Sequence, residues 1–116
     1  MKGQLISLTG PDYHGLYVSF RGTNCQLRCN LGEASSMDLS FDEARALFAS
    51  IKSACESHEI VGTRIGRLSW TTDARPNPKV PDQLVVKFSG PLGWGHIGLS
   101  RRSVLSACEH FSIAFE

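Results

Sequence analysis

Two parts of the chain repeat the same order of elements, and this repetition constrains the fold more than any other feature of the sequence. In each part a strand pattern ends in glycine, an intervening element follows, and a second strand closes on Leu-Ser before a helix pattern. The parts are LYVSFRG with MDLSFDEARALFASI, and LVVKFSG with IGLSRRSVLSACEHF. Serine commonly caps a helix after any strand, so the shared Leu-Ser is weak evidence by itself. The order of elements predicts a β-sheet-then-helix duplication.

The predicted fold class is α+β, with a mostly antiparallel curved sheet and two helices packed on one of its faces. A chain of 116 residues is long enough to bury one core, so residues 1–116 are expected to form a single domain. No apolar run approaches the roughly 20 residues that span a bilayer, and the chain does not open on a continuous apolar signal segment. We therefore expect no membrane partner and a cytoplasmic location.

Capping signals place two helices. Ser40 and Glu43 form a capping-box pattern that predicts a helix over 41–57, and Ser100 predicts a second helix from 101 to about 111. The alignment of the two parts pairs positions across these helices. It matches Leu39 with Leu99, Ser40 with Ser100, Ala44 with Val104, Phe48 with Cys108, and Ile51 with Phe111.

Strand patterns account for most of the remaining chain. Strands are predicted at 4–8, 16–21, 25–31, 83–89 and 96–100, and the tail 112–116 is expected to add a final strand. The stretch VGTRIGRLSW, at 61–70, is interpreted as one bent or bulged strand because it contains two glycines. The segment 71–82 contains three prolines, which predicts a long loop.

The segment GPLGWG contains the start of a G-x-G-x-x-G match formed by Gly93, Gly95 and Gly98. A dinucleotide fingerprint needs its glycines in the turn between a parallel strand and its helix, whereas here they precede the capping Ser100. We interpret the segment as a hairpin connection and expect no cofactor. Trp94 then lies on a loop tip, either as a lid on the core, which we favour, or as an exposed contact residue.

The four cysteines are expected to be structural. Cys25 and Cys29 fall on one face of an alternating strand about 13 Å apart, too far to share a disulfide or a zinc ion. Together with Cys55 and Cys108 they are predicted to be buried, reduced thiols.

Catalytic motifs are not recognisable in this sequence. It contains no nucleophile motif, phosphate-binding loop, H-E-x-x-H or paired C-x-x-C. The four histidines are scattered, and His58 and His110 lie near predicted helix C-termini, where a polar or cationic side chain is stabilising. We therefore predict a protein that is not an enzyme and has neither catalytic nor metal-binding residues.

The first functional hypothesis is a small protein-binding regulator or inhibitor that docks stoichiometrically on a protein partner. In size and character the chain is similar to small stand-alone inhibitors such as anti-CRISPR proteins. Docking would use a sheet edge, Trp94, and the proline-rich loop with its exposed Arg75 and Lys79. The net charge of +1 favours this hypothesis, because proteins that neutralise many phosphates usually carry a strong basic excess.

The alternative hypothesis is a protein that binds single-stranded nucleic acid on an open sheet face. Repeated sheet-then-helix units resemble, at the level of topology, the Whirly and Pur-type DNA-binding domains. Aromatic side chains interleaved with basic ones bind unpaired bases, and residues 60–116 hold seven Lys or Arg against four Asp or Glu. The candidate contacts are Tyr17, Arg21, Arg28, Arg64, Arg67, Trp70 and Lys87.

Overall fold

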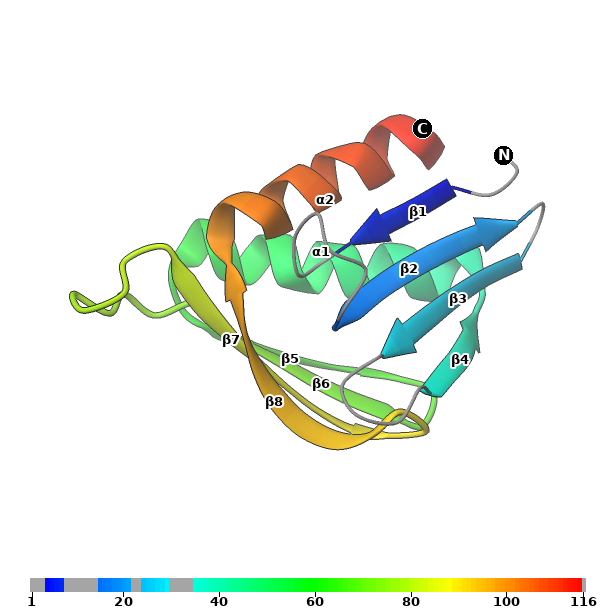
Figure 1. Ribbon diagram of the computed structural model, residues 1–116, viewed down its shortest axis with the longest axis horizontal. Helices are drawn as coiled ribbons and strands as arrows, with labels where there is room; N and C mark the ends of the chain where they lie inside the picture. Colours follow the sequence, from blue (N-terminus) through cyan, green and yellow to red (C-terminus); the bar gives the residue numbers. More distant parts are fainter. Residues whose placement is uncertain (1–3, 8–14, 22–23, 30–34, 116) are drawn as a thin grey trace.

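The computed structural model describes residues 4–7, 15–21, 24–29 and 35–115, of which residues 4–7, 20–21, 24 and 112–115 are described for their backbone alone (Figure 1). Four strands and a helix follow one another twice. The first unit is β1 (Gln4–Ser7), β2 (Leu16–Arg21), β3 (Asn24–Cys29), β4 (Ser35–Leu39) and α1 (Phe41–Ser57). The second is β5 (Ile60–Ile65), β6 (Leu68–Asp73), β7 (Gln83–Gly90), β8 (Gly93–Ser100) and α2 (Arg101–Phe115). The predicted α+β class and its sheet-then-helix duplication are confirmed.

The strands form two antiparallel sheets instead of the one curved sheet expected from the sequence. Strands β1 to β4 pair in chain order to make sheet A, and strands β5 to β8 pair in chain order to make sheet B. Strands joined by short connections pair with each other, whereas the 17 residues of α1 separate β4 from β5. Each unit therefore completes its own sheet before its helix begins.

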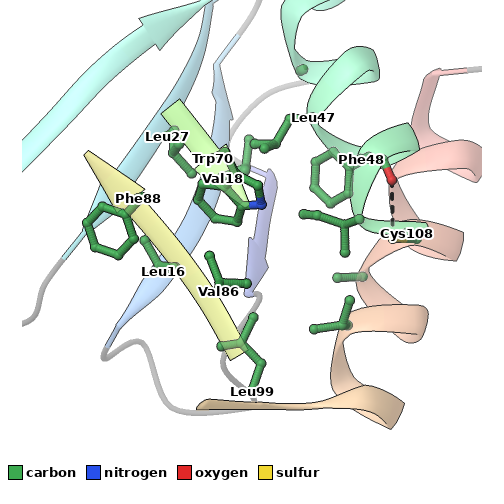
Figure 2. Close-up of a cluster of buried hydrophobic side chains, with 14 of the residues drawn as sticks. Leu16, Val18, Leu27, Leu47, Phe48, Trp70, Val86, Phe88, Leu99 and Cys108 are labelled. Carbon is green, nitrogen blue, oxygen red and sulfur yellow. Dashed lines mark hydrogen bonds between the residues drawn. The ribbon is translucent and has the colours of Figure 1, made fainter. Parts of the chain in front are cut away.

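One hydrophobic core joins the inner faces of both sheets to the two helices (Figure 2). Sheet A contributes Leu16, Val18 and Leu27, while sheet B contributes Trp70 and Val86, all fully buried. The apolar stripe of α1 faces this core. Its buried members include Ala44, Leu47, Phe48, Ile51, Ala54 and Cys55.

The two helices contact each other at positions that the sequence alignment pairs. The thiol of Cys108 on α2 donates a hydrogen bond to the carbonyl oxygen of Phe48 on α1 at 3.9 Å (Figure 2). The ring of Phe48 also stacks on that of Phe111, with 4.4 Å between centroids. The strand alignment was wrong by one position, because LYVSFR is the second strand of sheet A and LVVKFS lies in the third strand of sheet B.

Helix α1 begins as its capping box predicts. The Glu43 amide donates to Ser40 Oγ at 3.1 Å, and the Ser40 amide donates to Glu43 Oε1 at 2.9 Å. At the start of α2, Ser100 Oγ accepts from the Ser103 amide at 3.4 Å and donates to Asp82 Oδ2 at 2.7 Å. The predicted final strand is wrong, since residues 112–115 continue α2. A short apolar run is equally compatible with either element.

The stretch predicted as one bent strand is a hairpin. Strands β5 and β6 pair from Ile65 and Leu68 outward, and Gly66 and Arg67 form the two-residue turn between them. Gly66 has a φ of 58°, a conformation that glycine adopts without a steric penalty. This turn decides which residues of β6 point toward the core.

All four cysteines are buried and unpaired, as predicted. Burial raises the pKa of the Cys25 thiol to about 11 and that of the Cys108 thiol to about 12. The pKa of Cys55 is also raised by burial, against an opposing effect of the nearby Arg101 guanidinium. These thiols therefore act as small apolar core residues.

Candidate functional site

The outer face of sheet B points away from the core and carries exposed aromatic and basic side chains. Strand β6 buries Leu68, Trp70 and Thr72, so its alternate residues face outward. Strand pairing then aligns the outward residues in three rows that cross β5, β6, β7 and β8. The rows are Arg64-Ser69-Ser89-Trp94, Gly62-Thr71-Lys87-His96 and Ile60-Asp73-Val85-Gly98.

Trp94 is the most prominent residue of this outer face. It is the second residue of β8 and is 84% exposed, so both its predicted loop-tip position and the lid role that we favoured are wrong. The connection is shorter than expected, because only Pro91 and Leu92 separate β7 from β8. Leu92, which is 5% exposed, is buried at this turn where the tryptophan was expected.

Two flanking glycines make the tight connection between β7 and β8. Gly90 has a φ of 138° and Gly93 a φ of 84°. A Cβ atom on Gly90 would collide with the carbonyl group of Arg67, so β7 and the β5–β6 turn approach more closely here than any other residue allows. Gly93, Gly95 and Gly98 all lie on β8 within an antiparallel hairpin, which is not the strand-to-helix turn of a dinucleotide site.

Trp70 is not a contact residue, contrary to the sequence prediction. Its side chain is fully buried on the inner face, and its Nε1 donates to Thr72 Oγ1 at 3.0 Å. Its ring lies beside that of Phe88, with 6.1 Å between centroids. The prediction failed because the turn at Gly66 was not recognised, and without it the facing of β6 residues is undetermined.

Two basic side chains share the outer face with Trp94: Lys87 on the adjacent strand β7, and Arg64 on β5 at the other end of the same row. Arg64 and Lys87 are exposed, and no ion pair with another described residue engages either side chain. The Arg64 Nε donates to the carbonyl oxygen of Gly66 at 3.4 Å. His96 is the cross-strand partner of Lys87. Arg67, another predicted contact, is exposed in the β5–β6 turn at the end of the sheet.

The remaining predicted strand contacts lie on the outer face of sheet A, so the structure divides the predicted set between two sheets. Tyr17 and Arg28 are cross-strand partners, and the Arg28 guanidinium carbon lies 5.7 Å from the centre of the Tyr17 ring. Their neighbours include Asp38, whose carboxylate accepts a hydrogen bond from the side-chain Nε2 of Gln26 at 3.2 Å. For Arg21 the structure describes only the backbone, so its predicted role lies outside the described side chains.

The proline-rich loop is shorter than predicted and spans residues 74–82, because β6 extends to Asp73. Arg75 and Lys79 are exposed on it as expected. The Arg75 guanidinium donates twice to the Asp73 carboxylate, from Nε at 3.0 Å and from a terminal nitrogen at 2.8 Å. These hydrogen bonds, with a weaker contribution from Lys87, hold the pKa of Asp73 below its usual value.

His96 is a candidate contact that sequence reasoning missed. It was assigned to a strand beginning at 96, and its facing was not connected to Trp94. The signal was present in GWGHIGLS, where Trp94, His96 and Gly98 alternate with Gly95, Ile97 and Leu99. Treating Gly93 as the first strand residue would have placed the tryptophan and the histidine on one face.

The described part of the chain also bears on metal binding and membrane insertion. No group of three or more His, Cys, Asp or Glu side chains in this part of the chain is arranged to hold a metal ion. Neither described helix is long and apolar enough to cross a membrane.

Comparison with known proteins reveals similarity at the level of the fold. No protein-family model and no curated protein matches the chain. A solved structure of MRP1/MRP2 from Trypanosoma brucei matches with a TM-score of 0.51 and 20% identity, over 85% of this chain and 71% of that chain. A solved structure of a guide RNA-binding protein complex bound to a guide RNA matches with a TM-score of 0.49 and 17% identity, over 97% of this chain and 88% of that chain.

Proposed function

We propose that this protein binds single-stranded nucleic acid on the outer face of sheet B and performs no catalysis. The observation that carries the proposal is the exposed Trp94 on the same open face as Arg64 and Lys87. In the proposed complex Trp94 stacks on an unpaired base, and the two cations contact phosphates. His96 lies between Trp94 and Gly98 on the same face of β8, where it offers a second ring to the nucleic-acid strand.

The shape of this face suits a flexible single strand. The positions around Trp94 and Lys87 are small: Gly62, Ser69, Thr71, Ser89 and Gly98. Ser89, the cross-strand partner of Trp94, is one of these small residues, so a base can approach the indole ring from the β7 side of its row. Stacking of a base on an exposed aromatic contributes about 1–3 kcal/mol and does not depend on sequence, because every base has a π-face.

The local charge of sheet B supports the proposal although the net charge of the chain is only +1. The outer face and its adjoining loop carry Arg64, Lys87, Arg75 and Lys79 against Asp73 and Asp82, an excess of positive charge. The outer face of sheet A, by contrast, sets Arg28 against Asp38. Few phosphates would be neutralised on sheet B, so affinity would rest substantially on stacking. With two cations contacting phosphates, the logarithm of affinity should fall with the logarithm of salt concentration with a slope of about −1.4.

Fluorescence anisotropy with labelled oligonucleotides tests the proposal through a matched pair of variants. Arg64→Gln with Lys87→Gln removes two positive charges from the outer face. Arg45→Gln with Lys52→Gln removes two from α1, where both side chains are exposed. At low salt we expect the first variant to bind about tenfold more weakly than the unmodified protein and the second to change by less than about twofold.

Equal losses in the two variants would contradict the proposed face, because they would indicate attraction by overall charge. Absence of binding by the unmodified protein would contradict nucleic-acid binding itself. Docking on a protein partner stays a prediction that the same proteins can test. Affinity capture that loses its partner with Trp94→Ala and is unaffected by nuclease would favour the docking hypothesis.

A further inference from the structure

A hollow of about 340 Å³ lies where the proline-rich loop meets the ends of β6 and β7. Pro76, Pro78 and Val80 provide apolar walls, and the side chains of Asn77 and Gln83 are polar. This volume is at the lower end of the range for small-ligand sites, which is about 300–1,000 Å³. It suits a single flat heterocycle better than an extended chain.

The hollow is continuous with the outer face of sheet B. Asp73 and Val85 line it and also form the third row of that face. Along β7, Val85 is four residues from Ser89, the cross-strand partner of Trp94, a separation of about 13 Å. Lys87 lies between them on the same face. A single nucleic-acid strand that stacks on Trp94 and follows β7 past Lys87 therefore reaches the hollow.

Arg75 presents a flat, fixed surface at the wall of this hollow. Its two hydrogen bonds to Asp73 hold the guanidinium plane in one orientation. Guanidinium planes are common stacking surfaces for unpaired bases. The Asp73 carboxylate also lines the hollow and would repel a phosphate, so the charge pattern favours a neutral base over the backbone.

The loop that closes the hollow is held in shape by its own hydrogen bonds. Asn77 Oδ1 accepts from the Lys79 amide at 3.0 Å, and its carbonyl oxygen accepts from the Val80 amide at 3.1 Å. The Gln83 amide donates to the Val80 carbonyl oxygen at 3.0 Å. A hollow that is formed before binding lowers the entropic cost of ordering a loop around a ligand.

We propose that this hollow holds one unpaired nucleobase, stacked on the Arg75 guanidinium, while the rest of the strand lies along β7 toward Trp94. The amide groups of Asn77 and Gln83 are the polar groups available to the edge of that base. The inference deepens the proposed function and rests on it. It assigns base contacts to both ends of the outer face and phosphate contacts to the middle.

Amide chemical-shift titration of the full chain separates base contacts from phosphate contacts. The probes are an oligothymidylate of about 12 nucleotides and an abasic oligonucleotide of the same length and charge. We expect the amides of Asn77, Lys79 and Val80 to shift with the oligothymidylate alone, whereas the Lys87 amide shifts with both probes. Arg75→Lys keeps the charge but removes the flat surface, and it should abolish the loop shifts.

Arg75→Lys should also weaken binding of the oligothymidylate about threefold to tenfold and leave binding of the abasic oligonucleotide unchanged. Arg45→Lys is the matched control, because Arg45 also pairs with a carboxylate, that of Asp42 at 3.2 Å, but on α1. Equal loop shifts with both probes, or no loop shifts while the Lys87 amide responds, would overturn the base-binding inference alone. No response of the Lys87 amide to either probe would overturn the proposed function.

Discussion

Trp94 and Ser89 face each other across β8 and β7, and this pairing places the largest exposed aromatic of the described residues beside a small side chain on an open sheet face. Sheets that present an aromatic ring flanked by small residues and cations offer a stacking surface for bases. On sheet B the ring lies in the row next to that of Lys87 and His96. The hydrophobic core on the inner face of sheet B holds this arrangement in place.

Replacing Trp94 should weaken binding without weakening the fold. Trp94→Ala removes the stacking surface, and we expect a loss of affinity for single-stranded oligonucleotides of about tenfold or more. Because the ring is 84% exposed, the free energy of unfolding should change by less than about 0.5 kcal/mol. Trp94→Phe keeps a ring and should retain most of the affinity. Anisotropy titration and urea unfolding measure the two effects separately.

Removing the acceptor of the buried indole should destabilise the protein. Thr72→Val keeps the side-chain shape but leaves the Trp70 Nε1 hydrogen without its partner, at a cost of about 1–3 kcal/mol. Thr71→Val makes the same chemical change one residue earlier, on the outer face, and should alter stability by less than about 0.5 kcal/mol. Equal urea midpoints for the two variants would show that the indole hydrogen bond contributes nothing.

The close approach at Gly90 should make that position much less tolerant than Gly93. Alanine at either position is strained by the positive φ, at about 1–2 kcal/mol. Only at Gly90 does the added Cβ also collide with the Arg67 carbonyl group, which should add about 1–3 kcal/mol. Gly93→Ala meets no atom within 4 Å. Thermal unfolding of the two variants should therefore rank Gly90→Ala clearly lower, and the reverse order would contradict the described turn.

The buried thiols should make the fold sensitive to high pH. The pKa values of about 11 for Cys25 and about 12 for Cys108 lie above the ordinary value of 9.0, so the unfolded chain ionises first. The stabilisation is fully present below pH 9 and is lost as pH rises through 9 toward 12. We expect urea midpoints to fall over that range, less steeply in Cys108→Ala.

Alkylation at pH 8 should be slow in the folded protein and fast in denaturant, and fast alkylation of the folded protein would contradict thiol burial.

Local patterns were sufficient to predict the helices and the facing of several strands. The capping box at Ser40 and Glu43 fixed the start of α1 because its hydrogen bonds lie within one turn. Alternation in β3 predicted that Cys25 and Leu27 are buried while Arg28 is exposed. Alternation in β7, where Leu84, Val86 and Phe88 share one face, likewise placed Lys87 on the other face, although its role in binding stays a prediction.

Features that depend on tight turns or on distant contacts were not predictable in this way. A tryptophan between Gly93 and Gly95 has the local pattern of a turn, which competes with the strand alternation of GWGHIGLS, and the pairing with β7 decides between the two. The face on which Trp70 lies depends on the turn at Gly66, which was not recognised in the sequence. The division into two sheets depends on where α1 packs, which no local pattern encodes.

The most direct test of the central claim is a titration of tryptophan emission with a single-stranded oligonucleotide at several salt concentrations. Trp70 is buried and serves as an internal constant, so a change in emission reports on Trp94. We expect quenching on binding, its loss in Trp94→Phe, and a logarithmic salt slope of about −1.4. Unchanged emission at every salt concentration, or binding that is insensitive to salt, would contradict the proposal that the outer face of sheet B binds single-stranded nucleic acid.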